Sequence, residues 1–466
     1  MATPIKFGTD GWRAIIADDY TVDNVKRVAE ATALFMKARK MKKAVIGHDC
    51  RFAGPLFVET TARVLGAYGI KCHIGTGFVS TPMVSLGVVK LKADLGIVIT
   101  ASHNPPSYNG YKLKAAYGGP MIPSEIAEVE ALIPDTCTLG SLPTMEAMRD
   151  KKLLVDSDLE TLYLRHARKN FDLKSIKQNA GRIAYDAMYG AGQRAVRALL
   201  PKCVFLHCDY NPGMHGQAPE PIHRNLLQLS ETIRKNPKIT AGLANDGDAD
   251  RIGMYDEDGN FVDSHHLLLI LLLYLHKYKG MSGKVVFTFS VTDKMKKMAE
   301  KFGLPYEITK VGFKYIAEIM TKEDVLVGGE ESGGLAVKGH IPERDGVWMG
   351  LLVFEFMAVT GKTLKGLVEE VYKEVGRFAF DRDDLHITEA QKQAVIEACK
   401  ARSYKAFGKY KVEGVDDLDG WKFIFGNDQW VMIRASGTEP VLRVYAQADS
   451  LATCREILDA AKGTIL

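Results

Sequence analysis

The feature that most constrains the fold is a unit that occurs three times: a short apolar segment that ends in a polar loop rich in glycine or proline. Segments rich in Val and Ile alternate with helix-like stretches over the first 375 residues, as in strands covered by helices. The segments that lead into the loops are residues 94–100, 239–243 and 324–327. Ligands bind at loops that follow parallel strands. We therefore expect three related α/β domains with mixed or parallel sheets, although any α/β protein shows some β-α-β alternation.

The last part of the chain has a different pattern. The pattern predicts helices at residues 389–402 and 451–462, and strands at residues 421–425, 430–433 and 441–447. Strands and helices grouped in this way are typical of a small α+β domain. We place the four domains at residues 1–155, 156–257, 258–375 and 376–466.

Composition excludes several classes of protein. The 61 basic and 57 acidic residues nearly balance, so no nucleic-acid partner is expected. The most apolar run, residues 267–275, is far shorter than the ~20 residues of a membrane helix and predicts a buried core helix. Seven cysteines without a C-x-x-C pair indicate reduced thiols. Because no charged leader precedes an apolar stretch at the N-terminus, we expect a cytoplasmic protein without a membrane partner.

The loop NDGDADR places Asp246, Asp248 and Asp250 at alternate positions behind a predicted strand. Carboxylates without nearby His or Cys suit Mg²⁺, which keeps coordination positions open for a phosphate oxygen. An EF-hand does not fit, because its sixth position would be Arg251 where the turn needs glycine. A solvated acidic turn that binds nothing stays possible on the residues alone.

Two further loops contain groups that could hold a sugar phosphate. RASGTEP, residues 434–440, combines an arginine, two hydroxyls and a glycine, which suits a phosphate but also an ordinary Ser-Gly turn. GGEESGG, residues 328–334, surrounds two carboxylates and a hydroxyl with glycines, so that sugar hydroxyls could approach closely, although a flexible acidic hairpin fits equally well.

The loop TASHNPPSYNGYK, residues 100–112, is predicted to be stiff and exposed. Pro105 and Pro106 restrict the backbone beside Ser102 and His103, so the loop is suited to holding a side chain in place. No G-x-S-x-G elbow surrounds the serine, and its histidine is a sequence neighbour, which disfavours a serine hydrolase. A serine that carries a phosphoryl group near a metal is the better hypothesis.

These motifs resemble those of the α-D-phosphohexomutases, which include phosphoglucomutase and phosphomannomutase. TASHNPPSYNGYK, DGDADR, GEESGG and RASGTEP occur in the family's order over essentially the whole chain. The resemblance implies three related α/β domains and a smaller C-terminal domain around a central cleft. It also implies an intramolecular phosphotransferase that interconverts hexose 1- and 6-phosphates through a phosphoserine and a 1,6-bisphosphate, which serves as activator.

The resemblance also implies a role for each matched position. Ser102 would be the phosphoserine, and Asp246, Asp248 and Asp250 would bind Mg²⁺ together with its phosphate. His103 and Lys112 match positions near the transferred oxygen and are both candidates for the general acid/base, while Arg13 and Arg251 match arginines at the phosphoserine. The residues expected to bind the sugar are Glu330 and Ser332, and those expected to bind its other phosphate are Arg434, Ser436, Gly437 and Thr438.

Departures from the family pattern bear on the hexose. Phe313 stands where mannose-active members often carry a Thr-Gly-His histidine, and Glu331 and Gly334 depart from the usual glucosamine-mutase loop Gly-Glu-Gln-Ser-Gly-His. Glucose 1-phosphate is therefore the favoured substrate, with mannose and glucosamine phosphates as alternatives. A non-catalytic sugar-phosphate-binding protein is the alternative from another class, and either a monomer or a homodimer is compatible with the sequence.

Overall fold

The computed structural model describes residues 3–435 and 441–466 and divides into two compact units. The first comprises Met1–Lys284 and Gly312–Leu367, and the second comprises Val285–Val311 and Val368–Leu466. Ser436, Gly437 and Thr438, expected to bind phosphate, lie outside the described residues.

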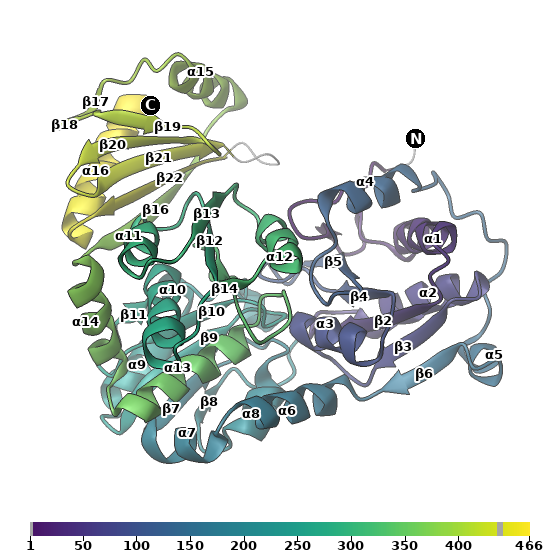
Figure 1. The fold of residues 1–466 in the computed structure, drawn as a ribbon. Helices are drawn as coiled ribbons and strands as arrows, with labels where there is room; N and C mark the ends of the chain where they lie inside the picture. Colours follow the sequence, from purple (N-terminus) through teal and green to yellow (C-terminus); the bar gives the residue numbers. More distant parts are fainter. Residues whose placement is uncertain (1–2, 436–440) are drawn as a thin grey trace. The chain divides into compact units, whose positions relative to one another are not determined.

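The N-terminal part of the first unit contains a mixed six-stranded sheet with the order β1-β5-β4-β2-β3-β6 (Figure 1). Strands β4, β2, β3 and β6 are parallel, whereas β1 and β4 both run antiparallel to β5. The strands are β1 (Trp12–Ile15), β2 (Lys43–His48), β3 (Lys71–Gly75), β4 (Leu95–Ile99), β5 (Tyr108–Ala115) and β6 (Leu154–Ser157). The helices are α1 (Val22–Ala38), α2 (Gly54–Ala67), α3 (Thr81–Lys90), α4 (Pro123–Ala131) and α5 (Met145–Asp150).

Alternation along the central strands explains how helices cover both faces of this sheet. Ala44 and Ile46 of β2 join the core formed with α1 and α2. Successive strand residues point to opposite faces, so Gly47 lies on the other face, where its missing Cβ leaves room for Val84 of α3. The central strand β2 is therefore covered on both faces.

The next part of the first unit has the five-stranded sheet order β11-β10-β9-β7-β8. β7 is parallel to β8 and β9, and β10 returns antiparallel beside β9. The strands are β7 (Arg182–Asp186), β8 (Val204–Leu206), β9 (Ile239–Asn245), β10 (Ile252–Tyr255) and β11 (Phe261–Val262). The helices are α6 (Leu159–Asn170), α7 (Leu173–Asn179), α8 (Gln193–Leu199) and α9 (Leu227–Lys235), with short 3₁₀ turns η1 (Met214–Gly216) and η2 (His223–Asn225).

The third predicted domain contains the buried helix expected from its apolar run. α10 (Ser264–Leu273) is buried throughout and continues as the π-helical turn η3 (Tyr274–Tyr278). β14 (Val325–Gly329) pairs antiparallel with β15 (Leu335–Val337), and β12 (Lys284–Thr288) pairs parallel with β13 (Tyr306–Thr309). The other helices are α11 (Lys294–Lys301), α12 (Phe313–Lys322), α13 (Gly346–Thr360) and α14 (Leu364–Val375).

The threefold unit takes a more specific form than the sequence predicts. Each of the three loops joins a strand to an antiparallel neighbour: β4 to β5, β9 to β10, and β14 to β15. Residues 108–112, expected to belong to the serine loop, instead begin β5. Each loop is thus anchored at both ends by strand pairing.

The C-terminal part of the second unit is an antiparallel sheet with the order β16-β22-β21-β20-β19, consistent with the expected α+β domain. The strands are β16 (Ala379–His386), β19 (Gly414–Asp416), β20 (Trp421–Gly426), β21 (Gln429–Ala435) and β22 (Val441–Ala448), and a separate pair is β17 (Ala406–Phe407) with β18 (Tyr410–Lys411). The helices α15 (Glu389–Lys400) and α16 (Leu451–Ile465) contribute to its core.

In the part of the chain that the structure describes, no single helix is both long and apolar enough to cross a membrane, and one bent pair, Gly346–Thr360 with Leu364–Val375, meets that test only jointly.

Candidate functional site

The serine loop follows β4 and places Ser102 against the aspartate loop that follows β9. Ser102 has a left-handed backbone with φ 51°, and its Oγ donates a hydrogen bond of 2.6 Å to Asp246 Oδ2. The serine is only 1% exposed, so the expectation of an exposed loop is wrong for this side chain. Its burial follows from the approach of the aspartate loop, because a Cβ on Gly247 would lie 2.5 Å from the Ser102 carbonyl oxygen. Only glycine allows the two loops to come so close.

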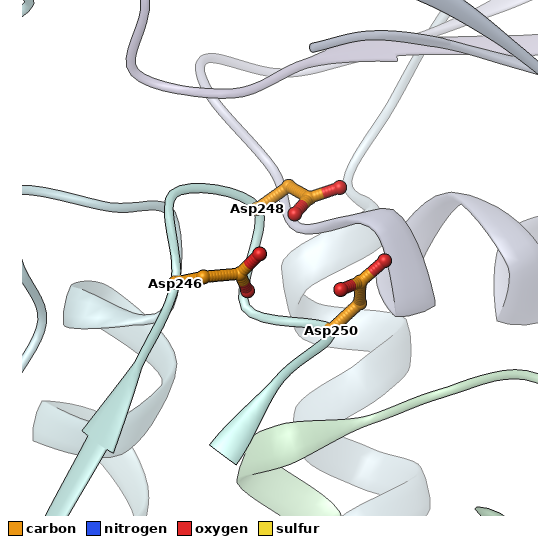
Figure 2. Close-up of side chains that lie close together, drawn as sticks. All are labelled: Asp246, Asp248 and Asp250. Carbon is orange, nitrogen blue, oxygen red and sulfur yellow. The ribbon is translucent and has the colours of Figure 1, made fainter. Parts of the chain in front are cut away.

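The three aspartates converge on one small space, as the sequence predicts. Figure 2 shows their side chains on the single loop between β9 and β10, and one carboxylate oxygen from each lies within 4.8 Å of the others. All three residues are buried, and Asp248 Oδ1 and Asp250 Oδ1 have no hydrogen-bond partner. Burial and the two neighbouring carboxylates raise the pKa of Asp246 well above its ordinary value. Unpartnered oxygens of this kind, with no His or Cys in the group, fit a hard cation such as Mg²⁺.

Cationic side chains offset part of this negative charge. Lys112 Nζ lies 2.8 Å from Asp248 Oδ2 and 3.1 Å from Asp250 Oδ2. It also lies 2.7 Å from Asp10 Oδ2, and Arg344 Nη2 lies 2.7 Å from Asp250 Oδ2. Burial lowers the pKa of Lys112, but the three carboxylates more than offset this effect and raise it above its ordinary value. Lys112 is therefore held as a cation inside the site.

Two arginines near the serine lack a carboxylate partner. In the described part of the chain, neither Arg13 nor Arg251 forms an ion pair, and Arg13 Nη1 donates a hydrogen bond of 2.6 Å to Asn104 Oδ1. His103 Nδ1 lies 3.4 Å from Ser102 Oγ. Burial, followed by the charges of Arg251 and Arg13, lowers the pKa of His103 well below its ordinary value. An anion beside Ser102 would thus meet unpaired guanidinium groups and a neutral imidazole.

The sugar-loop candidate lies beside the aspartate loop in the same compact unit. Ile252 N donates a 3.1 Å hydrogen bond to Gly333 O, and Gly334 forms a β-bridge with Arg251. Glu330 is 5% exposed, whereas Ser332 is partly exposed. The structure therefore brings Ser102, the three aspartates and the 328–334 loop together, as the sequence predicts for one site.

Burial raises the pKa of Glu330 to about 7, and this shift makes a testable prediction for stability. Between its unfolded pKa of about 4.3 and about 7, the folded protein binds more protons at this carboxyl than the unfolded chain, so the free energy of unfolding falls as pH rises through this window. In the wild-type protein, this carboxyl should lower the free energy of unfolding by roughly 3 kcal/mol between pH 5 and pH 8. We expect Glu330→Gln to lack this decrease.

Urea unfolding of the metal-free protein at several pH values would measure this loss, with the surface variant Glu59→Gln as control. If wild type and Glu330→Gln differ by the same free energy at pH 5 and at pH 8, the raised pKa is wrong.

Arg434 belongs to the second unit and is placed by a local contact. It lies on β21, and its Nε donates a hydrogen bond of 3.2 Å to Asp419 Oδ2. The same Asp419 oxygen accepts a hydrogen bond of 2.7 Å from Val311 N. Arg434 is thereby tied to the backbone that follows β13 within this unit.

The whole chain is similar to known protein families. Models of the four phosphoglucomutase/phosphomannomutase domains match this chain: α/β/α domains I, II and III at residues 4–137, 161–259 and 263–375, and the C-terminal domain at residues 385–462. The chain belongs to this family. Family members are intramolecular phosphotransferases that act as isomerases, and the four-domain α/β architecture expected from the sequence is confirmed.

Three relatives illustrate the range of this phosphohexomutase family. The phosphoglucomutase/phosphomannomutase of Thermococcus kodakarensis is 30% identical over 97% of this chain and 96% of its own. The phosphoglucosamine mutase of Methanococcus maripaludis is 32% identical over 95% of this chain and 94% of its own. A crystal structure from Thermus thermophilus, named for phosphomannomutase, has a TM-score of 0.87 and 33% identity, and each chain is covered completely. These names do not support glucose as the favoured hexose; they fit the alternatives, mannose and glucosamine, better.

Sequence reasoning missed several residues that complete the site of this phosphohexomutase. Asp10 and Arg344 form an ion pair beside Lys112. Thr81 Oγ1, at the start of α3, donates a hydrogen bond of 2.5 Å to Asp248 Oδ2. Asp10 stands in FGTDGWRA beside the expected Arg13, so its motif was a usable signal. Arg344 and Thr81 stand in segments that carry no comparable signal, and only the folded chain brings them to the aspartates.

Proposed function

We propose that this chain interconverts hexose 1-phosphates and hexose 6-phosphates, with Ser102 as the residue that carries the transferred phosphoryl group. The observation that supports this most directly is the 2.6 Å hydrogen bond between Ser102 Oγ and Asp246 in a buried cluster of three aspartates. A hydroxyl at a cation-binding cluster, next to unpaired arginines, suits phosphoryl transfer better than acyl transfer. A non-catalytic sugar-phosphate binder would have no use for this arrangement.

We assign Asp246, Asp248 and Asp250 as the Mg²⁺ ligands, together with an oxygen of phosphorylated Ser102. The unpartnered oxygens of Asp248 and Asp250 support this assignment. When bound, Mg²⁺ would supply positive charge next to the phosphoryl oxygens. Lys112, Arg13 and Arg251 would add fixed positive charge, which is the main contribution that a protein makes to this reaction.

In the transfer itself, the free hydroxyl oxygen of a hexose monophosphate attacks the phosphorus on Ser102. The new O–P bond forms as the Ser102 Oγ–P bond breaks, and the serine oxygen takes up a proton as the attacking hydroxyl loses one. Between the two acid/base candidates we favour His103, because its Nδ1 lies 3.4 Å from Ser102 Oγ while Lys112 is bound to three carboxylates. The resulting 1,6-bisphosphate reverses its orientation in the site and returns its other phosphate to Ser102.

Recognition of the sugar is assigned to Glu330 and Ser332, and recognition of the second phosphate to Arg434 with Ser436, Gly437 and Thr438. Arg434 offers a guanidinium fork that binds phosphate whichever end of the sugar carries it. A hexose 1,6-bisphosphate is the expected activator, because it can phosphorylate Ser102 directly.

For the hexose itself, we place glucosamine phosphate first, mannose phosphate second and glucose phosphate third. Relatives over the whole chain are named for glucosamine or for glucose and mannose. This order replaces the preference for glucose.

The test compares turnover of the three hexose 1-phosphates by the purified protein with Mg²⁺ and catalytic hexose 1,6-bisphosphate. We expect kcat/KM for glucosamine 1-phosphate to exceed that for glucose 1-phosphate by about 10-fold. A higher kcat/KM for glucose would reject the proposed order, and no turnover of any of the three would reject the mutase function.

A further inference from the structure

The loop that follows β2 contains a buried arginine to which none of the motifs assigns a role. Arg51 has no exposed surface. The strand β4, which pairs with β2, leads directly into the serine loop. Because β2 and β4 are parallel neighbours, the loops that follow them lie side by side. Asp49 N donates a 3.1 Å hydrogen bond to Ile99 O, which fixes the start of one loop against the other.

The two Nη atoms of Arg51 bind the backbone of the serine loop, while its Nε faces the carboxylate of Asp49. Its Nη2 donates hydrogen bonds to Ser102 O at 2.7 Å and Asn104 O at 2.6 Å. Its Nη1 donates to Pro105 O at 2.7 Å and Tyr108 O at 2.9 Å. All four Nη hydrogens of the side chain are thus engaged by carbonyls between residues 102 and 108.

The composition of the serine loop explains why it needs an external donor. Pro105 and Pro106 have no N–H group, and the loop's own backbone bonds include Asn104 N to Ala101 O and Tyr108 N to Pro105 O, both 3.0 Å. A carbonyl that is shielded from water and has no donor destabilises the fold. A planar fork with four donors can serve several carbonyls at once, whereas a lysine has three donors on a single point.

Asp49 and Thr100 connect the same arginine to the serine itself. Asp49 Oδ2 lies 3.3 Å from Arg51 Nε and accepts a hydrogen bond of 2.5 Å from Thr100 Oγ1. Thr100 Oγ1 in turn accepts a 2.9 Å hydrogen bond from Ser102 N. Both backbone polar groups of Ser102, its N–H and its carbonyl, are therefore held by one group of residues, which we call the Arg51 clamp: Arg51, Asp49 and Thr100.

We propose that Arg51 is the positioning residue for Ser102, and that the clamp holds the serine in its left-handed conformation against the aspartate loop. The contacts support this directly: the Ser102 carbonyl is bound by Arg51 on one side, and Gly247 allows the aspartate loop to approach it on the other. Arg51 then acts on the phosphoryl-transfer step through the backbone, not on sugar affinity. This inference rests on the proposed role of Ser102 as phosphoryl carrier.

The test measures how fast Ser102 is phosphorylated by a hexose 1,6-bisphosphate with Mg²⁺, using quenched samples and intact-mass spectrometry. We expect Arg51→Lys to slow phosphorylation about 100-fold, because a displacement of roughly 1 Å in a reacting group has an effect of that size. We expect affinity for hexose 6-phosphate to change by less than about threefold, since the substrate contacts are intact.

Arg27→Lys is a matched control. Arg27 is also buried in the first domain and donates to two backbone carbonyls, Pro134 O at 2.7 Å and Thr3 O at 3.0 Å, but none of the site residues is among its partners. It should lower Tm without slowing phosphorylation by more than about twofold. If Arg51→Lys does not fold, Thr100→Val tests the same clamp, because it keeps the side-chain shape and removes the bond to Ser102 N.

The outcomes separate this inference from the proposed function. If Ser102 is phosphorylated as fast in Arg51→Lys as in the wild-type protein, the proposed role of the clamp is wrong. The same holds for Thr100→Val where that variant is used. Equal slowing by Arg27→Lys at an equal loss of Tm would overturn it too, because general destabilisation would then explain the effect. Failure of the wild-type protein to accept phosphate at Ser102 would instead reject the proposed function.

Discussion

Replacing Ser102 by alanine is expected to lower mutase turnover on the order of 10⁴-fold or more, because the residue proposed to carry the phosphoryl group would be lost. The fold should survive, since alanine removes only the hydroxyl that bonds to Asp246. Turnover of hexose 1-phosphate with Mg²⁺ and hexose 1,6-bisphosphate measures the effect. Ser107→Ala is the control, because Ser107 is an exposed serine in the same loop and has no proposed role.

Near-normal turnover by Ser102→Ala would place the phosphoryl carrier elsewhere in the chain. Equal inactivation by Ser107→Ala would indicate that the loop tolerates no change, and would remove the argument for Ser102 in particular.

Replacing Asp248 by asparagine is expected to lower Mg²⁺-dependent turnover about 10³-fold, because one of the three proposed carboxylate ligands loses its charge. The reason is local: Asp248 Oδ1 is buried without a partner, while Oδ2 accepts hydrogen bonds from Lys112 and Thr81. Asparagine keeps the shape and one oxygen but cannot neutralise a divalent cation in the same way.

Thermal unfolding gives a second measure that does not depend on activity. Mg²⁺ at 100 times its Kd should stabilise the wild-type protein by about 2.7 kcal/mol, and Asp248→Asn should lose most of that gain. Asp258→Asn, an exposed aspartate just before β11, should keep both turnover and the stabilisation. Equal stabilisation of Asp248→Asn by Mg²⁺ would remove Asp248 from the metal site.

The fold class could be predicted because strand, helix and loop patterns are local. Residues 239–243 and 324–327 correspond to β9 and β14, and the apolar run 267–275 corresponds to a buried helix and its π-helical extension. The return strands β5, β10 and β15 were not predicted, because an apolar segment after a loop does not reveal which neighbour it pairs with or in which direction. The four domain boundaries stay predictions, and Arg434 is placed only within its own unit.

Much of the candidate site could be predicted for the same reason. Short motifs whose residue types and spacing indicate their chemistry contain Ser102, Asp246, Asp248 and Asp250. The structure brings these four residues together. Arg51 and Arg344 could not be found in this way. Their importance depends on which loops are neighbours in the folded chain, as with Arg344 and Asp10, which are separated by 334 positions.

The most direct test of the whole account is the mass of the protein and of its Ser102 peptide after incubation with hexose 1,6-bisphosphate and Mg²⁺. The account predicts one added phosphate, located on Ser102, which disappears when excess hexose 1-phosphate is supplied as acceptor. An unmodified protein, or a phosphate at another residue that turns over with substrate, would contradict it.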